Sequence, residues 1–126
     1  MFDVNLNLSG ITYHRFMIKD KSKIITIRDG HEFDLGTFKI RTIHTPGHTR
    51  GCVSFLYKKY IFAGDTLFKG TVGRTDLPTS DFHDLEQSLI RIVKETKDNT
   101  VVYPGHGHFT TILNEKYDNP FLKKAL

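Results

Sequence analysis

Three short motifs each place a potential metal ligand beside a glycine. His48 lies in TPGHTRG, Asp65 ends AGD, and His106 lies in YPGHG. Each motif follows an apolar segment with the pattern of a β-strand, so each side chain is expected at the end of a strand, on a loop held by a rigid sheet. Neighbouring strands would bring the three side chains together at one edge. Imidazole and carboxylate groups suit zinc, iron or manganese, so the combination predicts a metal site.

Other polar residues near these motifs could assist such a site. His44 and His108 are candidates for hydrogen bonds to the ligands. In the segment LFKGTVGRTDLP, Lys69 and Arg74 could receive an anionic substrate. Alternatively, Arg74 stabilises its own loop by pairing with Asp76 or with backbone carbonyls.

The strands that would position these residues are predicted from alternation. IITIRDG (24–30) and TFKIRTI (37–43) have strand character, and IITIRDG ends in an Asp-Gly turn signal. CVSFLYKKYIFAGD (52–65) has the pattern of a β-hairpin with Lys58 and Lys59 at its tip. The segment 1–22 shows no clean periodicity and is expected to form loops with short extended pieces.

The second half of the chain alternates loop, helix and strand. Residues 66–80 contain glycine and proline breaks and are predicted to form a long loop. A helix is expected from Ser80 or Asp81, either of which can cap it, because apolar residues recur at spacings of three and four over 82–93. NTVVYPGHG predicts a buried strand, and TTILNEKYDNPF predicts a short helix that ends at Pro120. These elements indicate a layered α/β-type arrangement with one sheet.

Composition limits the possible classes of protein. A chain of 126 residues with 38% hydrophobic content can bury one core and is too short for two ordinary domains. No apolar run approaches the roughly 20 residues of a membrane span. The net charge is +4, but the lysines and arginines are dispersed, which argues against nucleic-acid binding. The single cysteine, Cys52, is expected to be a small buried hydrophobe, and its lack of a partner fits a reducing, cytoplasmic location.

Together, TPGHTRGCVSF, YIFAGDTLFKGTVGRTDLP, VYPGHG and NEKYDNPF resemble the metallo-β-lactamase superfamily, most of all its hydroxyacylglutathione hydrolase (glyoxalase II)-like members. The resemblance implies an α+β fold. It further implies that the chain is a single partial domain over residues 1–126, the second (carboxy-terminal) part of an αββα sandwich, with one mixed sheet and flanking helices. By position, His48 resembles the third histidine of the family's first metal site, Asp65 the bridging carboxylate, and His106 the last histidine of the second site.

One family motif has no counterpart here. The remaining metal ligands of the family come from T-H-x-H-x-D-H, and the nearest segment, TYHRFMIKD, has neither its spacing nor its second histidine. The chain is therefore expected to be the second part of a longer enzyme. It is also expected to bind metal weakly or not at all, and to show little turnover.

The resemblance implies a hydrolase with two metal ions, zinc with iron or manganese as alternatives. These ions make hydroxide available near neutral pH, and the hydroxide attacks the carbonyl of a small anionic thioester such as S-lactoylglutathione. One alternative is a persulfide dioxygenase-like enzyme, which shares the GRTD loop and uses a single iron. Another is a non-catalytic subunit or remnant that binds a partner.

The resemblance also has a consequence for assembly. In a two-sheet sandwich each sheet covers the inner face of the other, so one inner face is expected to be open in this chain. Large exposed apolar surfaces usually find partners. The expectation is a homo-oligomer, or pairing with a missing amino-terminal half.

Overall fold

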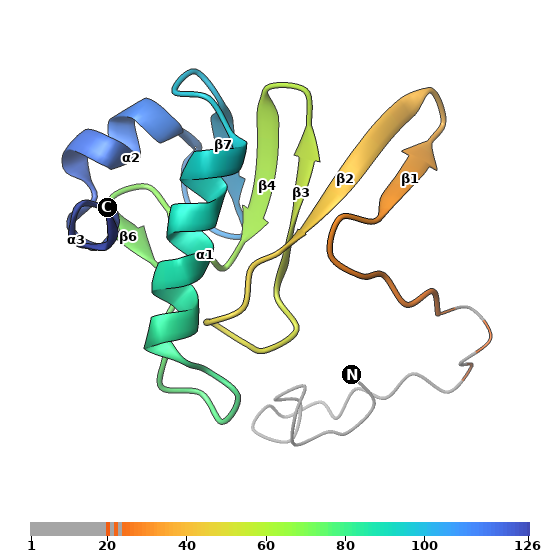
Figure 1. Cartoon of the computed structure of the whole chain (residues 1–126), viewed down its shortest axis with the longest axis horizontal. Helices are drawn as coiled ribbons and strands as arrows, with labels where there is room; N and C mark the ends of the chain where they lie inside the picture. Colours follow the sequence, from red (N-terminus) through yellow and green to blue (C-terminus); the bar gives the residue numbers. More distant parts are fainter. Residues whose placement is uncertain (1–19, 21, 23) are drawn as a thin grey trace.

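A mixed sheet of six strands is the framework of the computed structural model, which describes Asp20, Ser22 and residues 24–126 (Figure 1). The sheet order is β1-β2-β3-β4-β7-β8, and β5 and β6 form a separate hairpin. The expectations for the amino-terminal loops and for TYHRFMIKD fall almost wholly outside the described residues. The elements are β1 (Glu32–Leu35), β2 (Phe38–His44), β3 (Val53–Tyr57), β4 (Tyr60–Gly64), β5 (Leu67–Phe68), β6 (Thr71–Val72), α1 (Phe82–Glu95), β7 (Val101–Pro104), β8 (Thr110–Thr111), α2 (Ile112–Asp118) and α3 (Pro120–Ala125).

The strand directions bring three strand ends to one edge. β2, β3 and β4 are successively antiparallel, whereas β4 and β7 are parallel, with Ile61 opposite Val102. Consequently β2, β4 and β7 run the same way, and their carboxyl ends lie at the same edge. A parallel pair needs a long crossover, and α1 lies within this one. The predicted α+β arrangement of one mixed sheet with flanking helices is confirmed.

Helix α1 covers one face of the sheet and seals the core (Figure 1). Ile43, Ile61 and Val102 project from that face and are fully buried. Leu89 and Ile92 of α1 belong to the same buried cluster. Burial of such side chains contributes about 1.5–3 kcal/mol each, so this layer supplies much of the stability of the domain.

The predicted helix over 82–93 is confirmed, with Asp81 as its cap. The Asp81 carboxylate accepts a hydrogen bond from the backbone N–H of Asp84 at 2.9 Å, which satisfies one of the free donors of the first turn.

Among the described residues, no helix is long and apolar enough to span a membrane.

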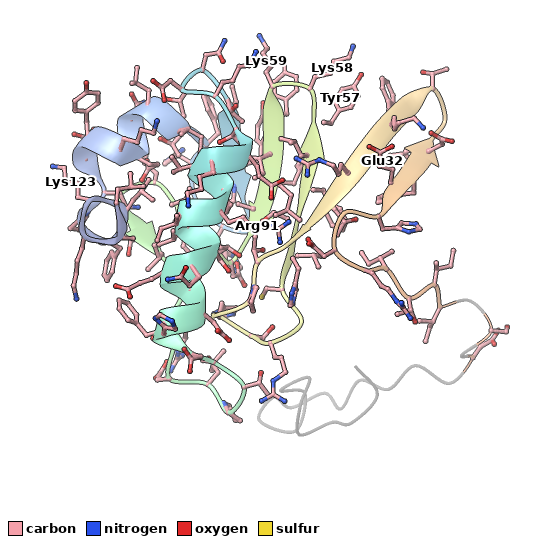
Figure 2. The ribbon with its side chains drawn as sticks, viewed as in Figure 1. Glu32, Tyr57, Lys58, Lys59, Arg91 and Lys123 are labelled. Carbon is pink, nitrogen blue, oxygen red and sulfur yellow. The ribbon has the colours of Figure 1, made fainter. Side chains whose placement is uncertain are left out.

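The predicted hairpin of β3 and β4 is also confirmed. Tyr57 lies opposite Tyr60, and Lys58 and Lys59 form the turn between them, as Figure 2 shows. Lys58 has a φ of 51°, a left-handed conformation that is uncommon for residues other than glycine. The turn therefore forms without the usual Asn-Gly or Asp-Gly signal.

The strand predicted over 24–30 is wrong. Residues 24–28 have no regular structure, Ile25 is 82% exposed, and β1 begins only after the turn at Asp29 and Gly30. The physical reason is a distant contact. The Asp29 carboxylate accepts hydrogen bonds from the guanidinium of Arg91 on α1, which fixes the turn against the helix.

Two further expectations need correction. The segment 66–80 is not all loop, because β5 and β6 form a hairpin whose turn contains Gly70 at a φ of 73°. The short helix predicted before Pro120 is α2, which ends at Asp118, but it is not the last helix, because Pro120 opens α3 at its first turn, where its missing N–H costs nothing. Asn119 separates the two helices and caps α3.

An ion-pair network joins α1 to β2 and to the turn before β1. Arg91 contacts Asp29 and also Glu95, and Arg41 of β2 contacts Glu95 at 2.5 Å. Figure 2 shows Arg91 on the side of α1 that faces β2. The Arg91 hydrogen bond lowers the pKa of the Asp29 carboxyl. Burial acts to raise the pKa of Glu95, but the hydrogen bonds from Arg91 and Arg41 outweigh it, and the net shift is downward.

Replacing Arg91 by Met should lower the free energy of unfolding by about 1 kcal/mol at neutral pH, since the network is only half-buried. The loss should shrink as the pH falls. Carboxylates with lowered folded-state pKa values stabilise the protein above their unfolded pKa values, and that contribution disappears as pH falls through the folded ones. Urea unfolding between pH 7 and pH 3 measures both effects. Lys94→Met, an exposed position on the same helix, is the control, and an equal loss in both variants would contradict the prediction.

Candidate functional site

The three predicted ligands meet at the sheet edge. His48 lies in the loop after β2, Asp65 directly follows β4, and His106 follows β7. His48 Nε2 lies 3.5 Å from Asp65 Oδ2, and His106 Nε2 lies 3.3 Å from Asp65 Oδ1. Each imidazole therefore faces a different oxygen of one carboxylate.

Imidazole nitrogens and carboxylate oxygens are donors that suit zinc, iron or manganese. Within the described part of the chain, no group of three His, Cys, Asp or Glu side chains is arranged to hold an ion. Zinc sites generally use three or four protein ligands, so each ion would need ligands beyond His48, Asp65 and His106.

The orientation of His48 is set by a backbone carbonyl. Its Nδ1 lies 2.9 Å from the carbonyl oxygen of Arg74. A carbonyl can only accept, so Nδ1 carries the hydrogen, and the ring is held with Nε2 facing Asp65. No sequence motif indicated this role for the Arg74 backbone.

The loop that carries His48 is hydrogen-bonded to α1 and to the two residues before it. Three successive carbonyls accept hydrogen bonds: Pro46 from the Ser88 hydroxyl at 2.6 Å, Gly47 from the Asp81 N–H at 2.9 Å, and His48 from the Ser80 hydroxyl at 2.7 Å. Ser80 and Ser88 were missed as site-supporting residues. The one available signal was a serine, Ser88, within the apolar stripe of the helix.

A chain of buried hydroxyls joins the strand ends beneath the site. Thr45, which follows β2, has its hydroxyl 3.0 Å from that of Ser54. Thr66, which follows Asp65, has its hydroxyl 3.2 Å from that of Thr45. All three residues are fully buried. The loops of His48 and Asp65 are thus connected below the surface, which limits their relative movement.

Two glycines permit close approach to Asp65. A Cβ at Gly73 would lie 1.9 Å from the backbone oxygen of Asp65, and a Cβ at Gly105 would lie 2.5 Å from its Oδ1. Neither position can carry a side chain without a shift. These contacts explain glycines in both the GRTD loop and the PGHG motif.

A cavity of about 400 Å³ lies beside His106. One wall comes from the turn between β5 and β6, with Phe68, Lys69 and Thr71, and the other from the loop after β7. The second wall includes His108. The Phe68 and His106 rings are 6.1 Å apart between centroids. Lys69 and His108 are therefore placed at a cavity that adjoins the metal-ligand candidates.

Arg74 and His44 lie differently from the other candidates. The Arg74 guanidinium makes two hydrogen bonds to the Asp76 carboxylate, at 2.5 and 2.6 Å, and both side chains are exposed. The hydrogen bonds from Arg74 lower the pKa of Asp76 to about 2. The alternative in which Arg74 braces its loop thus describes the contacts present. His44 Nε2 lies 3.0 Å from the Arg50 carbonyl and does not contact the three ligand candidates.

The chain belongs to the metallo-beta-lactamase superfamily, whose family model matches residues 5–106. Hydroxyacylglutathione hydrolase GloC of Haemophilus influenzae is 40% identical over 97 residues, which cover 75% of this chain and 46% of GloC. An uncharacterized protein of Mycobacterium leprae is 39% identical over 126 residues, 98% of this chain and 58% of that protein. The chain spans about half the length of the curated relatives it matches.

Solved structures share the fold. The BLEG-1 B3 metallo-beta-lactamase matches with a TM-score of 0.85 and 35% identity, over 96% of this chain and 59% of that one. The di-iron-bound form of TTHA1623 matches with a TM-score of 0.73 and 35% identity, over 90% and 56%. ETHE1 from Myxococcus xanthus matches with a TM-score of 0.73 and 36% identity, over 76% and 44%. The family resemblance seen in the motifs is confirmed.

The two close approaches to Asp65 should respond differently to alanine. Gly73→Ala should lower the free energy of unfolding by about 1–3 kcal/mol, because a backbone carbonyl blocks the new methyl group. Gly105→Ala should cost less, since the Asp65 carboxylate can rotate away, but it should separate that carboxylate from His106. Urea denaturation measures the first effect, and a crystal structure of Gly105→Ala measures the second. Gly51→Ala, which meets open space, is the control; equal stability in all three variants would contradict the prediction.

Proposed function

We propose that the chain supplies the carboxy-terminal half of a metal-dependent hydrolase that cleaves thioesters such as S-lactoylglutathione. The observation that carries the proposal is the Asp65 carboxylate, which faces His48 with one oxygen and His106 with the other. The similarity to hydroxyacylglutathione hydrolase GloC supports the substrate class. A cytoplasmic location is part of the proposal.

His48, Asp65 and His106 would hold the metal ions. When bound, a two-ion centre activates water for attack near neutral pH and polarises a carbonyl. The Arg74 carbonyl keeps Nε2 of His48 aimed at the site. We propose zinc as the metal, and the di-iron form of TTHA1623 supports iron as the alternative.

The cavity beside His106 would receive the substrate. Phe68 offers an aromatic surface and Lys69 a positive charge on the same wall. This pairing suits a small molecule that has both an apolar portion and a carboxylate. Arg74 is a weaker candidate for binding the anion, because Asp76 already occupies its guanidinium.

Two other functions remain as alternatives. The similarity to ETHE1 is consistent with a persulfide dioxygenase-like iron enzyme. The proximity of His106 to Asp65 favours a two-ion centre instead, because a mononuclear iron enzyme need not have this second-site ligand. A non-catalytic partner-binding subunit has no need of His48, Asp65 and His106 at one edge.

The chain purified alone should hold far fewer than two metal ions, as measured by inductively coupled plasma analysis. Co-production with a polypeptide that carries the family's T-H-x-H-x-D-H motif should bring two ions and cleavage of S-lactoylglutathione. His48→Ala and His106→Ala should each reduce kcat/KM at least about 100-fold in that complex. His83→Ala, an exposed position on α1, is the control. Two tightly held ions in the chain alone would contradict the prediction, and oxygen uptake with glutathione persulfide in place of hydrolysis would favour the dioxygenase.

The sheet face opposite α1 is rich in exposed aromatic side chains. Phe62 and Tyr103 stack at 5.5 Å between centroids, and the ring of Phe109 lies 6.1 Å from that of Tyr103. Phe38 is 49% exposed, Phe62 45% and Tyr103 40%. Because Phe62 and Tyr103 alternate with the buried Ile61 and Val102, they lie on the face that α1 does not cover. We propose that this aromatic face pairs with the portion of the fold that the longer relatives contain, or with a second copy.

Light scattering coupled to size-exclusion chromatography should show self-association of the chain at micromolar concentration. Phe62→Thr should weaken it about tenfold or more, because the change removes the centre of an aromatic cluster while keeping strand propensity. Tyr117→Gln, at an exposed aromatic position on α2, is the control. A stable monomer for the unmodified chain would contradict the prediction.

A further inference from the structure

A buried carboxylate in α2 makes contacts that the proposed chemistry does not use. Glu115 is 1% exposed, and its two oxygens bind different segments of the chain. Oε1 accepts a hydrogen bond from the Thr110 hydroxyl at 2.7 Å, and Oε2 accepts one from the backbone N–H of Gly70 at 2.9 Å. One side chain therefore links two segments that are 40 residues apart (Thr110 minus Gly70).

These two segments are continuous with the two walls of the cavity beside His106. Gly70 sits in the turn between Lys69 and Thr71, which line one wall. Thr110 follows the loop that contributes His106 and His108 to the other wall by only two residues. Glu115 thus links the two walls of the cavity, because each of its carboxylate oxygens accepts a hydrogen bond from one wall's segment.

Asn119 completes the connection on the side of the β5–β6 turn. Its amide nitrogen donates to the Thr71 carbonyl at 3.0 Å and lies 2.8 Å from Glu115 Oε2. Its amide oxygen accepts from the N–H of Leu122 in α3. The turn directs both an N–H and a carbonyl inward, so it needs one acceptor and one donor. A carboxylate beside an amide supplies both.

The chemistry of this pair indicates a role other than stability. Burying a polar side chain is costly unless hydrogen bonds compensate, so an apolar side chain would be the simpler way to fill this space. Among the described residues, the Glu115 partners are a hydroxyl, an amide and a backbone N–H, none of them a cation. An apolar residue would fill the same space but would leave the Gly70 N–H without its acceptor and both walls without a common tie.

We propose that Glu115 and Asn119 are positioning residues that fix the spacing of the two cavity walls. They hold Phe68 and Lys69 at a set distance from His106, whose ring lies 6.1 Å from that of Phe68. The part of this inference that concerns substrate rests on the proposed function, because it takes the cavity as the binding site. The part that concerns the spacing of the two walls is independent of the proposed function.

The test uses three variants in the full chain, followed by nuclear magnetic resonance. Glu115→Ala should speed hydrogen exchange of the Gly70 amide about tenfold or more and should shift the His106 ring signals, as that ring moves relative to Phe68. Glu115→Gln should restore both signals, since its carbonyl can accept from Gly70 while its NH2 donates to the Thr110 hydroxyl. Thr110→Val should shift the His106 signals and leave Gly70 protected, because it frees only one wall.

Thr110→Val removes a single hydroxyl, so the inference stays testable if Glu115→Ala fails to fold. Asp118→Ala, at an exposed position on the same helix, is the control and should change neither signal. Unchanged His106 ring signals in Thr110→Val, or a Glu115→Gln protein that exchanges Gly70 as fast as Glu115→Ala, would overturn the inference.

A titration with S-lactoylglutathione separates the inference from the proposed function. If the ligand binds, its Kd should rise about tenfold in Glu115→Ala and stay within about twofold in Glu115→Gln. A wild-type chain that shows no response at Lys69 or Gly107 would count against the proposed substrate. The positioning inference would then still be supported by the predicted changes at Gly70 and His106, and overturned by their absence.

Discussion

The parallel pairing of β4 with β7 is the contact on which the candidate site depends. Ile61 and Val102 lie opposite each other in this pair and are fully buried beneath α1. Their burial fixes the register, and the register delivers Asp65 and His106 side by side where the strands end. The crossover helix that parallel pairing requires also holds the loop of His48, through the hydroxyls of Ser80, just before the helix, and Ser88, in its middle. One packing unit therefore positions all three side chains.

Polar contacts below the sheet edge then fix the relative positions of the loops that carry His48 and Asp65. The hydroxyls of Thr45 and Thr66 join neighbouring loops, and Gly73 and Gly105 allow backbone to approach Asp65 more closely than any side chain would permit. Such support matters because the side chains of a binding or catalytic site must be held to a fraction of an ångström. The exposed loops thus take their precision from buried neighbours.

The sequence predicted the features that local patterns encode. Periodicity identified α1, alternation identified β2, and the Pro-Gly and Gly-Asp signals located the strand ends at which His48 and Asp65 stand. The failures involve contacts between distant residues. The strand expected over 24–30 is replaced by a turn that Arg91 holds from 62 residues away. The hydrogen bond from the Gly70 N–H to Glu115 joins residues 45 positions apart, and no local sequence pattern predicts it.

The two faces of the sheet differ in how well they are covered, since α1 packs on only one of them. A sheet that meets water on one face usually carries polar residues there, but in this mixed sheet the face opposite α1 carries rings such as Phe62 and Tyr103. The candidate ligands His48, Asp65 and His106 lie at the edge of the same sheet. Under the proposal above, a polypeptide that covered the aromatic face would also stand next to Asp65. Excluding water from the rings and completing the ligand set would then be consequences of one association, so metal affinity should depend on the packing of that face.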